Sequence, residues 1–357
     1  MAMEKVVVVG AGGISRFWFE AIAAEGVEVA AIVELDFAKG EVQRRKYCPG
    51  AIVSNDLEGT LEKMRPDFVI DLTAPQARAA VACTALKAGF HVLCEKPLAD
   101  NIETANDIVK AAEHGGRMCM VSQSRRWDKG PATVHDAIRN GVIGALTSVH
   151  CDFFLGAHFG DCELTDSDSP EEAYALATAM ARRTMSSPLI RDMAVHHFDM
   201  ARFMTGLDPI SVYAHEFNPR GSWYDGACSA VCIFEMVGGV IFSYRGSWSA
   251  EGFTTEWNGN WRLIGQSGTI LYEKDGPPQA QLAVGNKAFR RPLRDVELAG
   301  ANVPHPGMRG ALREMLTFLR VGQAPQTPCQ DNIKSCAMVA AALSSAHAGH
   351  RVPVVLA

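Results

Sequence analysis

One short segment brings an ionisable side chain to the end of a strand: "GFHVLCEKPLAD", residues 89–100. Its apolar run ends in Glu95, Lys96 and Pro97. Because burial disfavours an ammonium group, a lysine in this position has a physical reason to lose its proton. Lys96 is therefore a candidate for proton transfer, and a purely structural lysine is the alternative.

A second group of ionisable residues lies in "PLIRDMAVHHFDMARFMTG", residues 188–206. If this segment is a helix, Asp192 and His196 are four residues apart and share one face, and Asp199 follows three residues later. A carboxylate beside an imidazole fixes the tautomer of the ring and stabilises its charged form, as proton transfer requires. The same spacing suits zinc, but no further ligand cluster completes such a site, so we expect no metal. His197, about 100° further round the helix, is either a substrate contact or a packing residue.

A glycine-rich turn follows the first apolar run. In "VVVVGAGGIS", Gly10, Gly12 and Gly13 separate a strand from a helix, an arrangement that directs backbone N–H groups at a pyrophosphate. Glu34 closes the next strand, 22 residues after Gly12. A carboxylate there accepts hydrogen bonds from an adenosine ribose and repels a 2′-phosphate, so we expect NAD rather than NADP. Asp36 is a second candidate for this role, and capping of the next helix is the alternative for either acid.

The elements that position these residues change in kind near residue 125. Before it, strands alternate with helices, a pattern typical of βαβ units, a parallel sheet and an α/β fold. The predicted strands cover 5–12, 27–34, 66–75, 89–97 and 115–124, and the predicted helices 15–25, 37–47, 77–89 and 101–115. We therefore expect a doubly wound Rossmann domain over residues 1–125.

After residue 125, strands follow one another without intervening helices, which favours a large, mostly antiparallel sheet. "VGG" (237–239) predicts a hairpin turn. The predicted strands cover 146–156, 210–217, 228–249, 261–273 and 279–285, between helices at 130–144 and 332–349. We expect an α+β domain over residues 126–357 for substrate binding and oligomerisation.

Composition excludes several classes of protein. The net charge of −6 over 357 residues, without a dense basic stripe, argues against a nucleic-acid partner. No apolar run approaches the roughly 18 residues of a membrane span, and the first residues do not resemble a signal peptide. The ten cysteines form no CxxC pair. We expect a cytoplasmic protein with reduced thiols and no membrane partner.

Four motifs, taken in order, resemble those of the Gfo/Idh/MocA oxidoreductases: the glycine turn, "TAP" (73–75), "HVLCEKPLA" (91–99) and "RDMAVHHFDMARFMTG" (191–206). The resemblance covers nearly the whole chain. It implies a Rossmann domain, a second domain with an open sheet, and NAD-dependent oxidation of a sugar, cyclitol or glycoside hydroxyl, or the reverse reaction. The family's lysine falls on Lys96, where the peptide bond to the following proline is commonly cis. Its aspartate and histidine fall on Asp192 and His196.

The resemblance and the motifs together give the expected site. Proton transfer is assigned to Lys96, Asp192 and His196. The expected cofactor contacts are Gly10, Gly12, Gly13, Ile14, Ser15, Glu34, Thr73, Ala74, Pro75, Glu95, Lys96 and Gln123. The expected substrate contacts are Arg126, Trp127, His158, His197 and Tyr244, although packing is the favoured interpretation of the tryptophans at 127, 248 and 257. The open sheet is expected to form a homodimer or homotetramer.

Two other functions are compatible with the same fold. One is a redox-neutral, glycosidase-like enzyme that oxidises and re-reduces its sugar while NAD stays bound. The other is a dinucleotide-dependent sensor without catalysis. The presence of Lys96, Asp192 and His196 together argues against the sensor.

Overall fold

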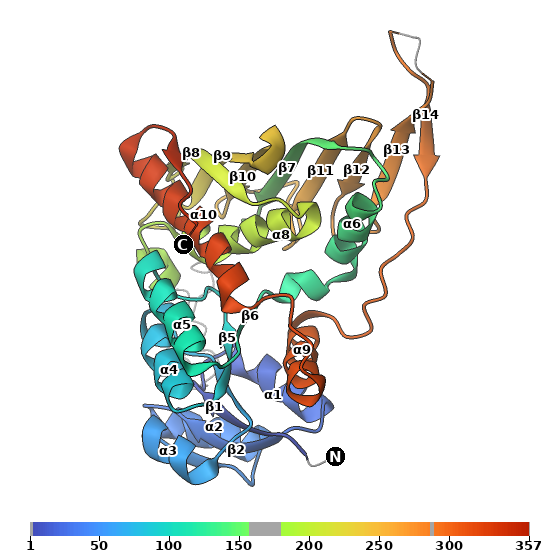
Figure 1. The fold of residues 1–357 in the computed structure, drawn as a ribbon. Coiled ribbons are helices and arrows are strands. Elements are labelled where there is room, and N and C mark those ends of the chain that lie inside the picture. Colours follow the sequence, from blue (N-terminus) through green and yellow to red (C-terminus); the bar gives the residue numbers. More distant parts are fainter. Residues whose placement is uncertain (1–2, 157–179, 286–288, 357) are drawn as a thin grey trace. The chain divides into compact units, whose positions relative to one another are not determined.

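The structure is a computed structural model that describes residues 3–156, 180–285 and 289–356 (Figure 1). It divides into two compact units. The first comprises Met1–Ser124 and His305–Cys336, and the second Arg125–Pro304 and Ala337–Leu356. The expected second domain, 126–357, therefore differs from the second unit: residues 305–336 pack with the first unit. A helix joins whichever core buries its apolar side, and the order of elements along the sequence does not specify that choice.

Within the described residues, the first unit contains a parallel sheet of six strands in the order β3-β2-β1-β4-β5-β6. The order reverses direction between β1 and β4, as in doubly wound folds, so the predicted fold class is confirmed. The strands are β1 (Lys5–Val9), β2 (Glu28–Val33), β3 (Ile52–Ser54), β4 (Phe68–Asp71), β5 (His91–Glu95) and β6 (Cys119–Ser122).

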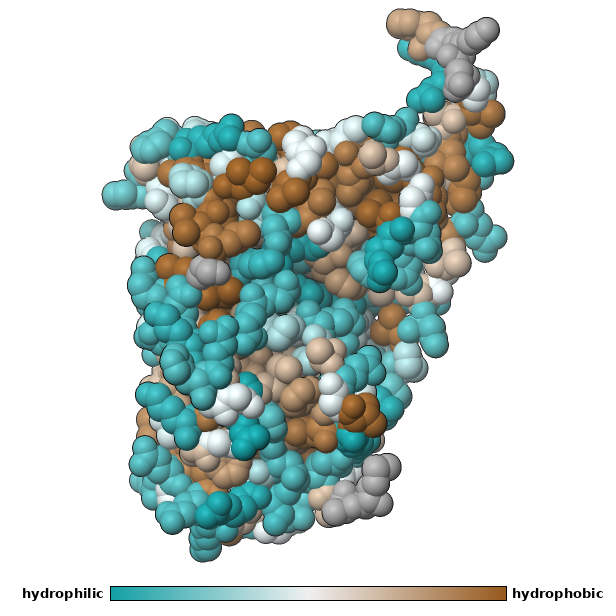
Figure 2. Space-filling model, viewed as in Figure 1, coloured by the Kyte–Doolittle hydropathy of each residue, from teal (hydrophilic) through white to brown (hydrophobic). Residues whose placement is uncertain are grey.

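Helices cover both faces of this sheet. Figure 1 shows α4 and α5 side by side on one face, and α1 with α9 on the other. Hydrophilic residues dominate the surface over α4 and α5, as expected for helices whose outer side faces water (Figure 2). The helices are α1 (Ser15–Ala24), α2 (Phe37–Tyr47), α3 (Leu57–Met64), α4 (Pro75–Lys87), α5 (Ile102–Gly115), α9 (Gly307–Val321) and the first part of α10 (Cys329–Ala348).

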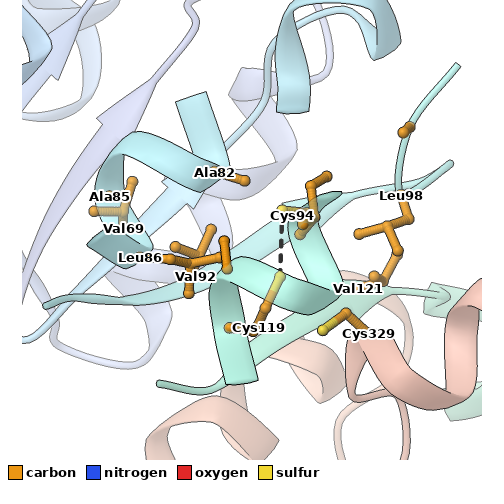
Figure 3. Close-up of a cluster of buried hydrophobic side chains, with 14 of the residues drawn as sticks. Val69, Ala82, Ala85, Leu86, Val92, Cys94, Leu98, Cys119, Val121 and Cys329 are labelled. Atoms are coloured by element: carbon orange, nitrogen blue, oxygen red, sulfur yellow. Dashed lines mark hydrogen bonds between the residues drawn. The ribbon is translucent and has the colours of Figure 1, made fainter. Parts of the chain in front are cut away.

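The core of the first unit contains a group of buried thiols. The sulfur of Cys94 on β5 lies 4.0 Å from that of Cys119 on β6 (Figure 3). Cys329, at the start of α10, belongs to the same buried cluster. The nine cysteines within the described residues are all free. Cysteine therefore serves here as a small apolar side chain that fills the core.

In its described part, the second unit contains a sheet of nine strands in the order β14-β13-β12-β11-β7-β10-β9-β8-β15. Every neighbouring pair is antiparallel except β7 with β10, so the prediction of a mostly antiparallel sheet is confirmed. The predicted hairpin turn at 237–239 joins β9 to β10. The strands are β7 (Leu146–Phe154), β8 (Pro209–Phe217), β9 (Ser229–Met236), β10 (Ile241–Ser247), β11 (Asn260–Gly265), β12 (Gly268–Tyr272), β13 (Gln279–Ala283), β14 (Leu293–Val296) and β15 (Val352–Pro353).

Helices cover one face of the nine-stranded sheet, where Figure 1 shows α6 (Lys129–Arg139) and α8 (Val195–Thr205). Phe198 of α8 packs edge-on against Phe234 of β9, with ring centroids 4.8 Å apart. A wide helical turn, η2 (Leu189–Ala194), precedes α8, and a short 3₁₀ turn, η1 (Ser124–Trp127), precedes α6. None of the helices in the described residues is long and apolar enough to cross a membrane.

Candidate active site

The glycine turn after β1 has the conformation that a dinucleotide loop requires. Gly10 has a φ of +97°, and a Cβ at this position would lie 3.0 Å from the carbonyl carbon of Leu72. Only glycine meets both conditions without strain. Among the residues that the structure describes, no side chain caps the start of α1, no acid lies in its first turn, and the buried Ser15 hydroxyl has no hydrogen-bond partner. This turn therefore fits a phosphate group.

Glu34 lies immediately after β2 and reaches the glycine turn. Its carboxylate accepts hydrogen bonds from the backbone N–H of Ala11, at 2.7 Å, and of Asp36, at 3.0 Å. Asp36 instead caps α2, accepting from the N–H of Ala38 at 3.2 Å. Of the two candidate acids, only Glu34 touches the glycine turn, where a ribose-binding carboxylate is needed.

The turn after β4 is fixed by an arginine that the sequence did not assign to the site. The N–H and hydroxyl of Thr73 donate to Asp71 at 3.0 and 2.6 Å. Arg78, on α4 and 2% exposed, donates to the carbonyls of Thr73 and Pro97 and so connects the turns after β4 and β5. Burial raises the pKa of Asp71, and Arg78 opposes that shift. Ala74 and Pro75, two predicted cofactor contacts, begin α4.

Lys96 directly follows β5, and the Lys96–Pro97 peptide bond is cis. The strand is fifth in the chain rather than the fourth that the sequence indicated, because β3 was not predicted. Lys96 is half-buried. The buried carboxylate of Glu95 accepts from the Lys96 N–H and from Trp18 Nε1, both at 2.9 Å, so each of its two oxygens is hydrogen-bonded within the protein. Burial raises the pKa of Glu95.

Gln123 follows β6 and is also buried, at 2% exposure. Its side-chain nitrogen has no hydrogen-bond partner within the described part of the chain. Because buried amide groups are normally paired, this donor is suited to a ligand acceptor. The glycine turn, Glu34 and Gln123 together fit a bound dinucleotide.

The predicted helix from 188 to 206 is not uniform. Asp192 lies in the wide turn η2, and His196 is the second residue of α8. A π-type turn contains an extra residue, so the rule that residues four apart share a face does not hold through it. Asp192 accepts from Arg182 Nε at 2.9 Å. Arg182 thus contacts a predicted site residue, and the sequence did not indicate this contact. His196 is 8% exposed.

Arg126, a predicted substrate contact, forms a buried ion pair. Its guanidinium donates twice to Asp199, both times at 2.7 Å, and lies 5.5 Å from the centre of the Phe203 ring. Arg126 and Asp199 are 7% and 1% exposed. A guanidinium held on two carboxylate oxygens has a structural reason for its position.

His197 and Tyr244, also predicted substrate contacts, lie in the aromatic core of the second unit. Both are 0% exposed, with ring centroids 5.4 Å apart, and Phe153 lies 4.7 Å from His197. Burial, reinforced by Arg125, holds the pKa of His197 well below its usual range. Burial likewise raises the pKa of Tyr244. Of the two interpretations of His197, the structure supports packing.

The tryptophans that the sequence singled out differ in exposure. Trp127 and Trp248 are buried, as favoured from the sequence, whereas Trp257 is 50% exposed. His158 lies outside the described residues. Within the described ranges there is no group of three or more His, Cys, Asp and Glu side chains that could hold a metal ion.

Two family models match the chain. Residues 4–123 match the oxidoreductase family with an NAD-binding Rossmann fold, and residues 132–271 match the Gfo/Idh/MocA C-terminal domain. The chain is 26% identical to D-apiose dehydrogenase of Paraburkholderia graminis over 98% of its length and 89% of that protein. It is 30% identical to inositol 2-dehydrogenase of Salmonella typhimurium, over 48% of the chain and 50% of that protein. This second match therefore spans about half of the relative.

Solved structures confirm the fold. A crystal structure of an oxidoreductase from Agrobacterium radiobacter in complex with NAD⁺, L-tartaric acid and magnesium superposes with a TM-score of 0.82, covering 99% of both chains at 19% identity. The matched models together span most of the chain, and the glycine turn, Glu34 and Lys96 lie where the sequence motifs predict. The chain belongs to the Gfo/Idh/MocA family of oxidoreductases, and its first domain is an NAD-binding Rossmann domain.

Proposed function

We propose that the protein is an NAD-dependent dehydrogenase or reductase that acts on a secondary hydroxyl or ketone of a sugar, cyclitol or glycoside. The observation that carries the proposal lies in the first unit, where Lys96 follows β5 at the edge of the sheet that also holds the glycine turn and Glu34. Ligands bind at the carboxyl ends of strands in this fold. Bound NAD would supply the hydride acceptor, and its reduced form the donor.

The chain's own residues would handle the proton. Lys96 is the proposed acceptor of the hydroxyl proton, with its backbone N–H held by Glu95. His196 is the second proposed acid–base group. Asp192, which pairs with Arg182, is proposed to position the acid–base group and to stabilise its charged form. Glu34 supports a preference for NAD over NADP.

The substrate class follows from the named relatives. One acts on a cyclitol and another on D-apiose, by their names. Both compounds carry several hydroxyl groups, so a polyhydroxylated ligand is the proposed substrate.

We also propose that two or four chains associate through the exposed face of the nine-stranded sheet, which carries Tyr213, Val231, Ile233 and Ile241.

The first test is reduction of NAD⁺ against a panel of inositols, aldoses, apiose, glucosides and anhydrosugars, with NADP⁺ in parallel. We expect NADH to appear with one class of substrate and a clear preference for NAD⁺. If no compound in the panel yields NADH while NAD(H) remains bound to the purified protein, the result would instead favour the redox-neutral enzyme or the sensor.

The second test removes the proposed base. Lys96→Ala is expected to lower turnover by about 10²- to 10⁴-fold, the usual contribution of a general acid–base group. Affinity for NADH, measured by fluorescence titration, should change little because the glycine turn and Glu34 are intact. Lys87→Ala, at the exposed end of α4, is the matched control. Near-normal turnover in the Lys96 variant would contradict the assignment.

A further inference from the structure

The loop between β10 and β11 carries an exposed tryptophan, Trp257, whose backbone carbonyl is hydrogen-bonded to side chains of other elements. Trp257 is 50% exposed. Its carbonyl oxygen accepts hydrogen bonds from the guanidinium of Arg125 and from His197 Nε2, the latter at 3.3 Å. Most large aromatic residues of this unit are buried, so the exposure of this one needs an explanation.

Asn258, the next residue, is held through its side-chain amide and its backbone carbonyl. The side-chain oxygen of Asn258 accepts from Arg125 at 2.7 Å, and its amide nitrogen donates to Tyr272 at 3.2 Å and to Asp128 at 3.3 Å. Its backbone carbonyl accepts from Trp261 Nε1 at 2.7 Å. Asn258 is 7% exposed. A buried polar network of this kind fixes the backbone that carries Trp257.

The backbone on both sides of Trp257 is also fixed, by a hydrogen bond at Thr255 and by close packing at Gly259. Thr255 is buried, and its N–H donates to the carbonyl of Phe154, at the end of β7, at 2.9 Å. Gly259 has a φ of +75°, and a Cβ there would lie 2.9 Å from the carbonyl of Asp152. The indole of Trp257 therefore presents a large apolar surface from a constrained backbone. That backbone loses little conformational freedom when a ligand binds.

The anchor also relates Trp257 to the proposed acid–base group. His197, whose Nε2–H donates to the Trp257 carbonyl, is the next residue after His196. Both belong to the second unit, so the loop and the start of α8 are held together within one packed body. The backbone of Trp257 therefore lies next to the first turn of α8, the helix that carries His196.

We propose that Trp257 is a specificity-determining residue whose indole packs on the C–H face of a cyclic sugar or cyclitol. This inference rests on the proposed function. Aromatic faces provide apolar contact with defined geometry, and polar groups elsewhere in a site then fix the hydroxyls. Binding of a ring is favoured over binding of an open chain, because only a ring presents a flat group of C–H bonds.

The test compares Trp257→Ala and Trp257→Phe with Phe253→Ala. Phe253 lies in the same loop and is fully exposed, so it is a matched control. For the ring substrate found in the panel, Trp257→Ala is expected to raise KM about tenfold, equivalent to ~1.4 kcal/mol, with kcat changed less than about twofold, as expected for uniform binding. Trp257→Phe should recover most of the affinity, and Phe253→Ala should behave as wild type. An unchanged KM in Trp257→Ala overturns the proposal.

A binding experiment separates this proposal from the proposed function. The NADH-loaded protein is titrated with myo-inositol, glucose, levoglucosan and the open-chain polyol glucitol while tryptophan fluorescence is recorded. A fluorescence change that a ring compound causes in wild type but not in Trp257→Phe supports ring binding by Trp257. This holds even if the panel shows no turnover, because absence of turnover counts only against the proposed dehydrogenase activity. No fluorescence change with any ring compound, or an equal change in Trp257→Phe, overturns the proposal that Trp257 binds the ring.

Discussion

At the scale of single residues, the structure gives two of the predicted substrate contacts protein partners of their own. Arg126 and Asp199 form a buried, two-bond ion pair, and His197 is enclosed by aromatic rings. Both pairings join residues that are distant in sequence or belong to different elements. The sequence predicts that such side chains point inward, but it does not predict which partner they meet.

Removing Arg126 should therefore affect stability. Arg126→Ala removes the two guanidinium hydrogen bonds from the buried Asp199 carboxylate, and we expect the free energy of unfolding to fall by about 3–5 kcal/mol. Urea-induced unfolding measures it. The control is Arg245→Ala, whose pair with Asp152 is exposed and should cost less than about 1 kcal/mol. A stable Arg126 variant with a raised KM would favour substrate contact instead.

His197 gives a pH dependence of defined sign. Its pKa is depressed in the folded state, so below about pH 6.5 the unfolded chain binds more protons than the folded chain. Stability conferred by neutral His197 is therefore present above this pH and is lost as the pH falls, by up to ~1.4 kcal/mol per pH unit. His197→Phe should show a smaller loss between about pH 7 and 5. Parallel pH profiles for the two proteins, measured by urea unfolding, would refute this account.

At the scale of elements, the sequence predicted most of what positions the site. The alternation of strands and helices gave the parallel sheet, and Glu34 and Lys96 lie at the strand ends where they were expected. Elements with weak signals were missed: β3 has three residues, β15 has two, and neither shows alternating burial. The helices α3 and α9 were not predicted either. α9 has helical periodicity, but its place in the first unit depends on contacts such as those of Arg309 and Arg313 with Glu25. The wide turn η2 has no sequence signature.

Arg78 shows how one residue couples elements. It donates to carbonyls in the turns after β4 and β5, the second of which contains Pro97. Arg78→Met should lower the free energy of unfolding by about 2–3 kcal/mol, because hydrogen bonds from a charged group are lost and buried carbonyls remain. NADH affinity should fall as well, since both turns flank the dinucleotide site. Arg45→Ala, at an exposed pair on α2, is the control for unfolding and titration. Unchanged values for both quantities would show that the two turns hold their shape without Arg78.

At the scale of the whole molecule, the described helices of the second unit lie on one face of its sheet (Figure 1), and in the described part of the chain the other face exposes apolar side chains. Tyr213, Val231, Ile233 and Ile241 come from three neighbouring strands and are each 38–45% exposed. Ile233 lies between Tyr213 on one side and Ser243 on the other. Apolar residues gathered in this way indicate an interface between proteins.

Ile233→Asp should consequently change the oligomeric state. A carboxylate in the centre of this face would be buried without a partner, so we expect sedimentation velocity to show a smaller species than for wild type. Val321→Asp, an equally drastic change at an exposed site on α9, should leave the assembly intact. Wild type sedimenting as a single chain would contradict the predicted interface.

The return of residues 305–336 to the first unit has a consequence for how the protein is made. A ribosome completes β1 to β6 long before it reaches Cys329, Ile333 and Cys336, which belong to the core of that unit. Until then the outer edge of β6 also lacks Thr327, whose backbone and hydroxyl pair with Val121. The nascent chain thus carries an open strand edge and an unfilled core while the entire second sheet is synthesised, and its early fate depends on protection from aggregation.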